Sequence, residues 1–99
     1  MKNKIDIIYD IVDYTKDKRI KWSVEQRNKS TVVFLGKMHI TKSKSLFFRF
    51  NYNDRVGNYY MSVKIHSKVD CTILVMTSDN YIYGADMDLI YYAIENSIT

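Results

Sequence analysis

The sequence predicts an α+β protein: an N-terminal helix, an antiparallel meander sheet of about five strands, and a C-terminal helix. Near both ends, apolar residues recur at three- and four-residue spacing, as amphipathic helices require. Between residues 20 and 77 they mostly alternate with polar residues, as in strands with one buried face. We expect one domain over residues 1–99, with both helices packed on one face of the sheet.

The first helix is predicted over residues 3–17. Its apolar residues return every three or four positions, so they share one side of the helix. This core-facing stripe is expected to contain Ile5, Ile8, Tyr9 and Val12. A second row with the same period consists of Asp6, Asp10, Asp13 and Asp17. We interpret the acidic row as a solvated surface of the helix.

Five strands are predicted after this helix. They occupy residues 20–25, 32–40, 46–52, 59–66 and 71–77. The segments between the first four are rich in Asn, Asp, Ser, Lys and Gly, which is typical of turns. A short extended segment is also predicted at 81–83.

The loops fix an expected register for the first four strands. A loop at 53–58 places Tyr52 opposite Tyr59. A loop at 41–45 places Gly36 opposite Phe50, and a three-residue loop at 28–30 places Trp22 on the other side of Gly36. A side chain at position 36 would crowd both aromatic neighbours, so we assign this glycine a structural role.

Two orientations of the fifth strand are open. A four-residue turn at 67–70 places Cys71 opposite His66 and directs Ile73 and Val75 to the solvent face, where they would form an apolar patch. A turn one residue longer or shorter buries Cys71, Ile73 and Val75 instead.

The second helix is predicted from about Asp86 onward. Its apolar stripe consists of Met87, Ile90, Tyr91, Ile94 and Ile98. Asp86 and Asp88 suit the N-cap and first turn, where negative charge is favourable.

Charge is unevenly distributed along the chain, whose net charge is +4. Residues 18–68 hold 12 Lys and Arg against two acidic residues, a net +10. Residues 69–99 hold five acidic residues and no Lys or Arg, a net −5. We therefore expect a basic side and an acidic side, a property that bears on partners rather than on the fold.

The solvent face of the predicted sheet is both basic and aromatic. The residues expected to contact a partner there are Lys21, Lys37, Phe47, Arg49, Tyr60, Lys64 and His66, and His39 is expected on the same face. Phe47 is expected opposite Lys64, and Tyr60 opposite Asn51.

This face fits a small non-enzymatic binding protein of the inhibitor or accessory-factor type, with a larger protein or protein complex as its partner. Single-stranded nucleic acid is the alternative, because cations can follow its backbone while aromatic rings stack on bases. Protein is preferred because residues 44–50 lack the glycines of the RNA-binding sheet signature. The acidic helices would also repel a long polyanion. Homodimerisation is a third hypothesis. Cross-strand pairing with solubilising lysines explains the same residues without any partner.

No catalytic or cofactor site is expected. A thiol beside an imidazole, as in a Cys71–His66 pair, can become a nucleophile, but no oxyanion donors or orienting group accompany it. One cysteine and two histidines lack a recognised metal-ligand spacing. The three glycines stand apart, so there is no phosphate-binding loop. We expect no enzyme activity, metal or cofactor.

Composition sets the remaining expectations. No apolar run approaches the length of a membrane span. A single cysteine fits a reducing compartment, so the cytoplasm is the expected location. Abundant Lys, Asn, Ile and Tyr with no proline suggests AT-rich coding and a phage or mobile-element source. From such a source, the partner could be a host defence or nucleic-acid-handling complex.

Overall fold

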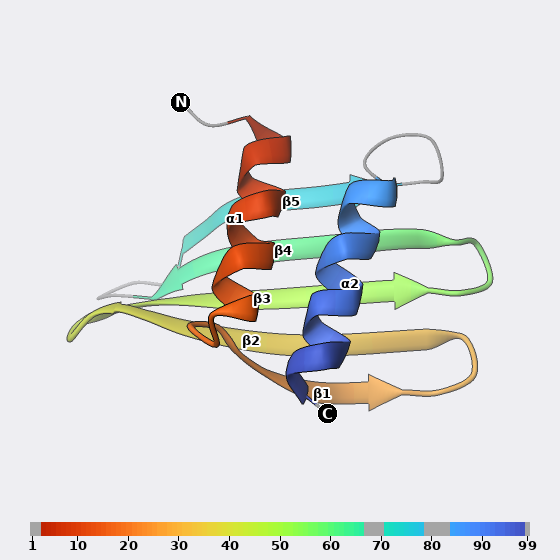
Figure 1. The fold of residues 1–99 in the computed structure, drawn as a ribbon, viewed down its shortest axis with the longest axis horizontal. Coiled ribbons are helices and arrows are strands. Elements are labelled where there is room, and N and C mark those ends of the chain that lie inside the picture. Colours follow the sequence, from red (N-terminus) through yellow and green to blue (C-terminus); the bar gives the residue numbers. More distant parts are fainter. Residues whose placement is uncertain (1–2, 67–70, 79–83, 99) are drawn as a thin grey trace.

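A computed structural model describes residues 3–66, 71–78 and 84–98 of the chain. Its elements, in chain order, are α1 (Lys4–Lys16), β1 (Lys21–Arg27), β2 (Thr31–Thr41), β3 (Lys44–Asn53), β4 (Asn58–His66), β5 (Cys71–Ser78) and α2 (Gly84–Ile98). The strands form one antiparallel sheet in the order β1-β2-β3-β4-β5 (Figure 1). The predicted α+β meander is thus confirmed. The extended segment predicted at 81–83 lies outside the described residues.

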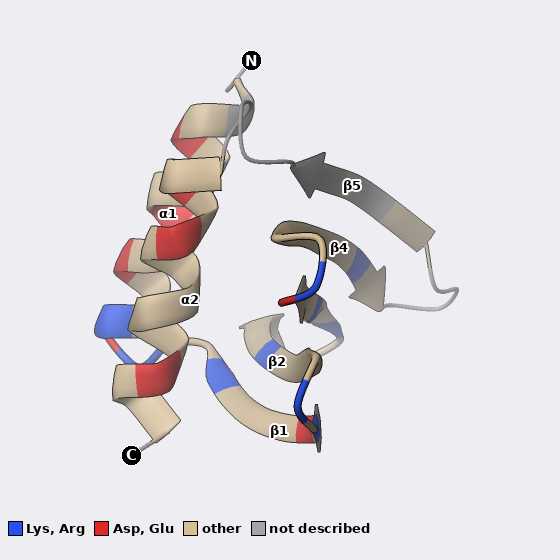
Figure 2. Cartoon of the chain, turned by 90° about the vertical axis from the view of Figure 1, so that its right-hand side faces the viewer, with Lys and Arg blue, Asp and Glu red and all other residues tan. Residues whose placement is uncertain are grey.

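The molecule has two layers. Both helices cross the same face of the sheet side by side (Figure 1), and the edge-on view shows the opposite face without a covering helix (Figure 2). Apolar residues from the helices and from alternate strand positions fill the space between the layers. Its fully buried members include Ile8, Phe34, Phe50, Met61, Met87, Ile90 and Ile94.

Local side-chain and backbone bonds set the ends of α1. The Asn3 side chain accepts a hydrogen bond from the Asp6 amide at 2.9 Å, which caps the first turn. At the other end the Lys18 amide donates to Thr15 and the Arg19 amide donates to Tyr14, the two bonds of a Schellman motif. That motif needs a left-handed residue, and Lys18 supplies it with a φ of 60°.

The buried side of α1 differs from the predicted stripe. Ile8 and Val12 are buried as expected, whereas Ile5 and Tyr9 are exposed and Ile11 is buried in their place. The reason is that α1 packs against α2 as well as against the sheet, which turns its buried side toward Ile11. The Tyr9 hydroxyl instead donates to Asp86 of α2 across the surface.

Helix α2 begins two residues before the predicted start. Met87, Ile90 and Ile94 are buried as predicted, and Ala93 joins them. Tyr91 is half-buried with its ring 5.8 Å from that of Phe34. Ile98, predicted in the stripe, is exposed at the last turn.

The register of β3 with β4 matches the prediction, from Tyr52 opposite Tyr59 to Leu46 opposite Ile65. The register of β2 with β3 is shifted by two residues from the prediction. Gly36 lies opposite Phe48 rather than Phe50, because both strands extend into the predicted loop and end in a tight turn. The shift keeps every side chain on its predicted face, since strand sides alternate with a period of two.

Gly36 lies in the crowded position that the sequence indicates. It pairs with Trp22 on one side and Phe48 on the other. A Cβ atom at position 36 would lie 2.8 Å from Cε3 of Trp22 and 2.9 Å from Cγ2 of Ile20. Glycine therefore lets the indole lie flat over β2.

The fifth strand follows neither predicted orientation along its whole length. Val75 lies opposite Ser62 and is exposed, as the four-residue turn predicts. The pairing shifts between Val63 and Lys64, however, so Cys71 lies opposite Ile65 and not opposite His66. The irregularity shifts the pairing of residues 71–72 by one position relative to residues 74–78, and neither predicted orientation includes such a shift. The side chain of Ile73 lies outside the described residues.

Candidate functional site

The face of the sheet turned away from the helices, called the open face below, brings the predicted partner-binding residues together. Lys21, Lys37, Phe47, Arg49, Tyr60, Lys64 and His66 are all exposed. Alternation along four strands directs them to the same side, and strand pairing aligns them in rows across the sheet. The placement of these side chains was predictable from strand parity.

The first row surrounds a phenylalanine with lysines. Lys21 lies opposite Lys37, which lies opposite Phe47, which in turn lies opposite Lys64. The Lys37 Nζ atom is 5.4 Å from the centre of the Phe47 ring, within the range of a cation–π contact. The His66 ring meets the Phe47 ring edge-on at 5.8 Å. Cations thus border a partly exposed aromatic ring.

The second row is apolar at two of its positions. Leu35 is 37% exposed and Val75 is 48% exposed, and both belong to the row that contains Arg49 and Ser62. The predicted set did not include Leu35, although its parity with Lys37 could have identified it. Together with Phe47, these residues provide apolar area on the open face from β2 to the edge strand β5.

A shallow hollow lies where these two rows meet. Its volume is about 210 Å³, and it is lined by Leu35, Gly36, Phe47, Phe48, Arg49, Ser62 and Lys64. The hollow therefore combines an apolar floor with two cationic side chains.

An intramolecular carboxylate orients Arg49. The Arg49 Nη1 atom is 2.9 Å from the Glu25 Oε2 atom, and both side chains are nearly half exposed. Glu25 stands where the β1–β2 register shifts, between Val24 and Gln26. Glu25 is the one acidic residue among the charged strand residues described on the open face.

The third row is more closed. Val33 is buried although it lies on the open face, between Gln26 and Asn51. Asn51 lies opposite Tyr60, as predicted. The Oδ1 atom of Asn51 is buried and has no hydrogen-bond partner among the described residues. Tyr60 remains 38% exposed and closes this end of the open face.

Charge differs between the two layers. Figure 2 shows acidic residues along the helices and basic residues along the strands. An ion pair joins the layers: Arg27 of β1 contacts Glu95 of α2 at 2.8 Å. The guanidinium of Arg27 also lies over the Phe34 ring at 5.8 Å. Arg27 therefore belongs to the packing between layers, whereas Lys21, Lys37, Arg49 and Lys64 lie on the open face.

The opposite side of the sheet holds a tyrosine cluster that sequence analysis did not identify. Tyr52, Tyr59 and Tyr91 lie with ring centroids 4.7–6.4 Å apart. The Tyr59 hydroxyl donates a hydrogen bond to Asp88 of α2. Burial, followed by this bond, raises the pKa of Tyr59 well above its ordinary value. The rings pack against one another and Tyr59 bonds to α2, so we interpret the cluster as a packing feature.

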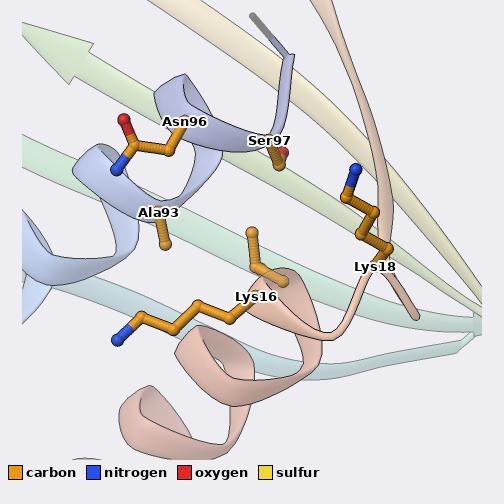
Figure 3. Close-up of a pocket in the computed structure, with 6 residues that line it drawn as sticks. Lys16, Lys18, Ala93, Asn96 and Ser97 are labelled. Carbon is orange, nitrogen blue, oxygen red and sulfur yellow. The ribbon is translucent and has the colours of Figure 1, made fainter.

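A second hollow lies between the C-terminal ends of the two helices. Its volume is about 180 Å³, and Figure 3 shows the lining side chains, with Lys16 and Lys18 extending in different directions. The Thr15 hydroxyl beneath it already donates to Ile11 and accepts a bond from the Trp22 indole. The lysines do not converge, so this hollow is a weaker candidate site than the open face.

The arrangement that a nucleophilic Cys71 would need is not formed. Cys71 is exposed and lies opposite Ile65, while His66 lies opposite Ser45. Within the described ranges, no three His, Cys, Asp or Glu side chains gather as a metal site would require. None of the described helices is long and apolar enough to cross a membrane.

Comparison with known proteins finds no matching family model, no matching curated protein and no matching solved structure.

Proposed function

We propose that the protein is a small non-enzymatic binding protein of the inhibitor or accessory-factor type. Its open face would bind an acidic surface on a larger protein or protein complex. The cytoplasm belongs to this proposal, in line with the single cysteine. A phage or mobile-element source belongs to it as well, with a host defence or nucleic-acid-handling complex as the target.

The observation that carries the proposal is the mixture of side chains on the open face. Leu35, Phe47 and Val75 present apolar area in adjoining rows. Lys37 and Lys64 flank the phenylalanine, and Arg49 lies beside the leucine. An apolar centre with charged groups around it is the anatomy of protein–protein interfaces, in which aromatic residues and arginine are frequent anchors.

Charge complementarity gives the chemistry of the partner. The open-face cations are exposed, and the acidic residues of the helices lie in the other layer. A carboxylate-rich surface would therefore meet favourable charge on approach. The Glu25–Arg49 pair shows the geometry in which a carboxylate meets this arginine.

Single-stranded nucleic acid remains the second candidate because of one observation. Phe47 offers a ring bordered by Lys37 and Lys64, a combination that can stack a base beside its phosphate. The exposed ring of Tyr60 lies two rows away from Phe47. Four residue steps along a strand are roughly 13 Å. The aliphatic row between the rings cannot stack bases, which favours protein.

A quantitative pull-down tests the proposal. Tagged wild-type protein is compared with the variant Arg49→Glu/Lys64→Glu in lysate of the source cells treated with nuclease. A control variant, Lys42→Glu/Arg55→Glu, changes net charge equally at exposed turn positions outside the open face. We expect a stoichiometric protein with wild type and control, reduced at least roughly tenfold with the open-face variant. Equal recovery with all three baits would contradict the proposal.

Fluorescence anisotropy with a labelled oligothymidylate tests the second candidate. Binding by the open face predicts an affinity that falls steeply with salt, with a slope set by the number of phosphates contacted. The same charge-reversal variant would abolish binding. Nucleic acid becomes the preferred ligand if two results are obtained together. Wild-type protein binds the oligonucleotide tightly at physiological salt, and nuclease treatment of the lysate abolishes recovery of a protein partner in the pull-down.

A further inference from the structure

The outer edge of β5 differs from every other part of the sheet boundary. β5 is the last strand of the sheet, and among the described residues only β4 pairs with it. Its eight residues, Cys71–Ser78, include no charged side chain and no proline. The backbone donors and acceptors on the outer side of such a strand can pair with another strand.

The opposite edge, β1, carries the features that normally prevent such pairing. Lys21, Glu25 and Arg27 place charges along it, and the register shift between Val24 and Gln26 interrupts its regular ladder. Charges and bulges are the usual protection of edge strands. β5 has an irregularity of its own, where its pairing shifts between Val63 and Lys64, but it carries no charge. Because only β1 places charges along its edge, the two edges are not equivalent, and β5 is the one suited to strand addition.

We propose that β5 pairs antiparallel with β5 of a second copy of this chain, forming one continuous sheet across the dimer. This inference does not depend on the proposed function. Two molecules of net charge +4 repel each other wherever their basic faces meet. The β5 edges carry no charge, so pairing them brings no cations of β5 together, and a second copy can fit there.

Symmetry places Val75 near the centre of this interface. In antiparallel pairs, directly opposite side chains point to the same face, so a two-fold axis normal to the sheet pairs a residue with itself. Val75 is exposed on the open face next to the edge. Pairing Val75 with its symmetry mate removes both side chains from water. The helices then lie on one side of the joined sheet, and the two open faces become continuous on the other.

The single native cysteine provides a direct test. Cys71 is exposed and lies four positions before Val75. Because of the irregularity in β5, residues 71–75 span only three residue steps of β4, from Ile65 to Ser62. Six steps of about 3.4 Å therefore separate the two Cys71 positions in the dimer, roughly 20 Å. Nitroxide labels on Cys71, measured by pulsed electron paramagnetic resonance, should show a distance centred near this value. A dimer with a clearly different distance, or a monomer at concentrations up to about 1 mM, would overturn the proposal.

Charge substitution at the edge gives the matching variants. Thr72→Lys/Val75→Lys changes two exposed β5 positions and should leave only monomer by sedimentation at concentrations where wild type dimerises. Ser23→Lys, at an exposed position of the opposite edge strand, is the control and should dimerise like wild type. Circular dichroism verifies that each variant is folded. Dimerisation by the folded β5 variant would contradict edge pairing. One strand pair buries little area, so we expect a weak dimer.

Discussion

Two single residues show how local geometry decides the choice of amino acid in this chain. At Gly36 the limit is space, because Trp22 and Ile20 occupy the volume that a Cβ atom would need. At Lys18 the limit is backbone conformation, because the turn after α1 requires a left-handed residue. The first position has the residue that its surroundings require, whereas the second has a lysine where glycine is most common.

Replacing Gly36 with alanine should destabilise the protein by about 1–3 kcal/mol, the range for overpacking a well-packed core. The added methyl would meet Trp22 at 2.8 Å. Urea denaturation followed by circular dichroism measures the change. Lys37→Ala, at the exposed neighbouring position, is the control and should change stability by less than about 0.5 kcal/mol. Equal stability of Gly36→Ala and wild type would show that the indole can move away at no cost.

Replacing Lys18 with glycine should stabilise the protein by about 1 kcal/mol, because glycine adopts the left-handed conformation without steric cost. Lys18→Ala is the matched variant: it removes the same charge but keeps the Cβ atom, so it should give no comparable gain. Thermal denaturation of the three proteins distinguishes the two effects. A similar gain for both variants would assign the effect to the charge instead.

At the scale of elements, the tyrosine cluster couples α2 to the sheet. Tyr52 and Tyr59 come from β3 and β4, Tyr91 comes from α2, and Asp88 accepts the Tyr59 hydroxyl hydrogen bond. Burial is the first cause that raises the pKa of each of the three tyrosines. The neutral phenols therefore belong to the folded state, and ionisation favours unfolding.

This coupling predicts a loss of stability at alkaline pH. A tyrosine whose pKa is raised by folding contributes its full stabilisation below the unfolded-state value near 10, and loses it as pH rises above that value. The free energy of unfolding should thus fall above about pH 10. Tyr59→Phe should be less stable at neutral pH but less sensitive to pH above 10. An identical alkaline slope for this variant would exclude Tyr59 as the titrating group.

The elements themselves were largely predictable, and the misses have physical causes. Period and parity identified the helices, the strands and the face of each predicted partner-binding side chain. Local pattern does not encode how tightly a polar loop turns, so the β2–β3 register was wrong by two residues. It also does not encode helix–helix contact, which buries Ile11 and leaves Tyr9 exposed.

The candidate site was predictable to the same extent as the strands that carry it. Every predicted partner-binding side chain lies on the open face because parity alone decides the face. The irregularities were not predictable, since a bulge depends on packing across strands rather than on composition. Glu25 therefore meets Arg49 without a sequence signal, and the position of Cys71 was missed for the same reason.

At the scale of the whole molecule, the two layers separate charge as well as hydrophobicity. The helices, which form the layer that covers the sheet, carry acidic residues (Figure 2). Strand pairing places Lys21, Lys37, Arg49 and Lys64 on the open face. A sheet face of this kind, left without a helix cover, is where a partner can add the missing layer. Edge pairing through β5 would double this surface and increase avidity for a partner with repeated acidic sites.

The most direct test of the central claim, that the open face is the partner-binding surface, is site-specific photo-crosslinking in the source cells. A benzoylphenylalanine is placed at Tyr60 on the open face or at Tyr92 on α2, both exposed aromatic positions. We predict a discrete adduct with a larger protein from position 60 only, which disappears when Arg49→Glu/Lys64→Glu is added. An adduct from position 92 and none from position 60 would contradict the claim, as would an adduct to nucleic acid.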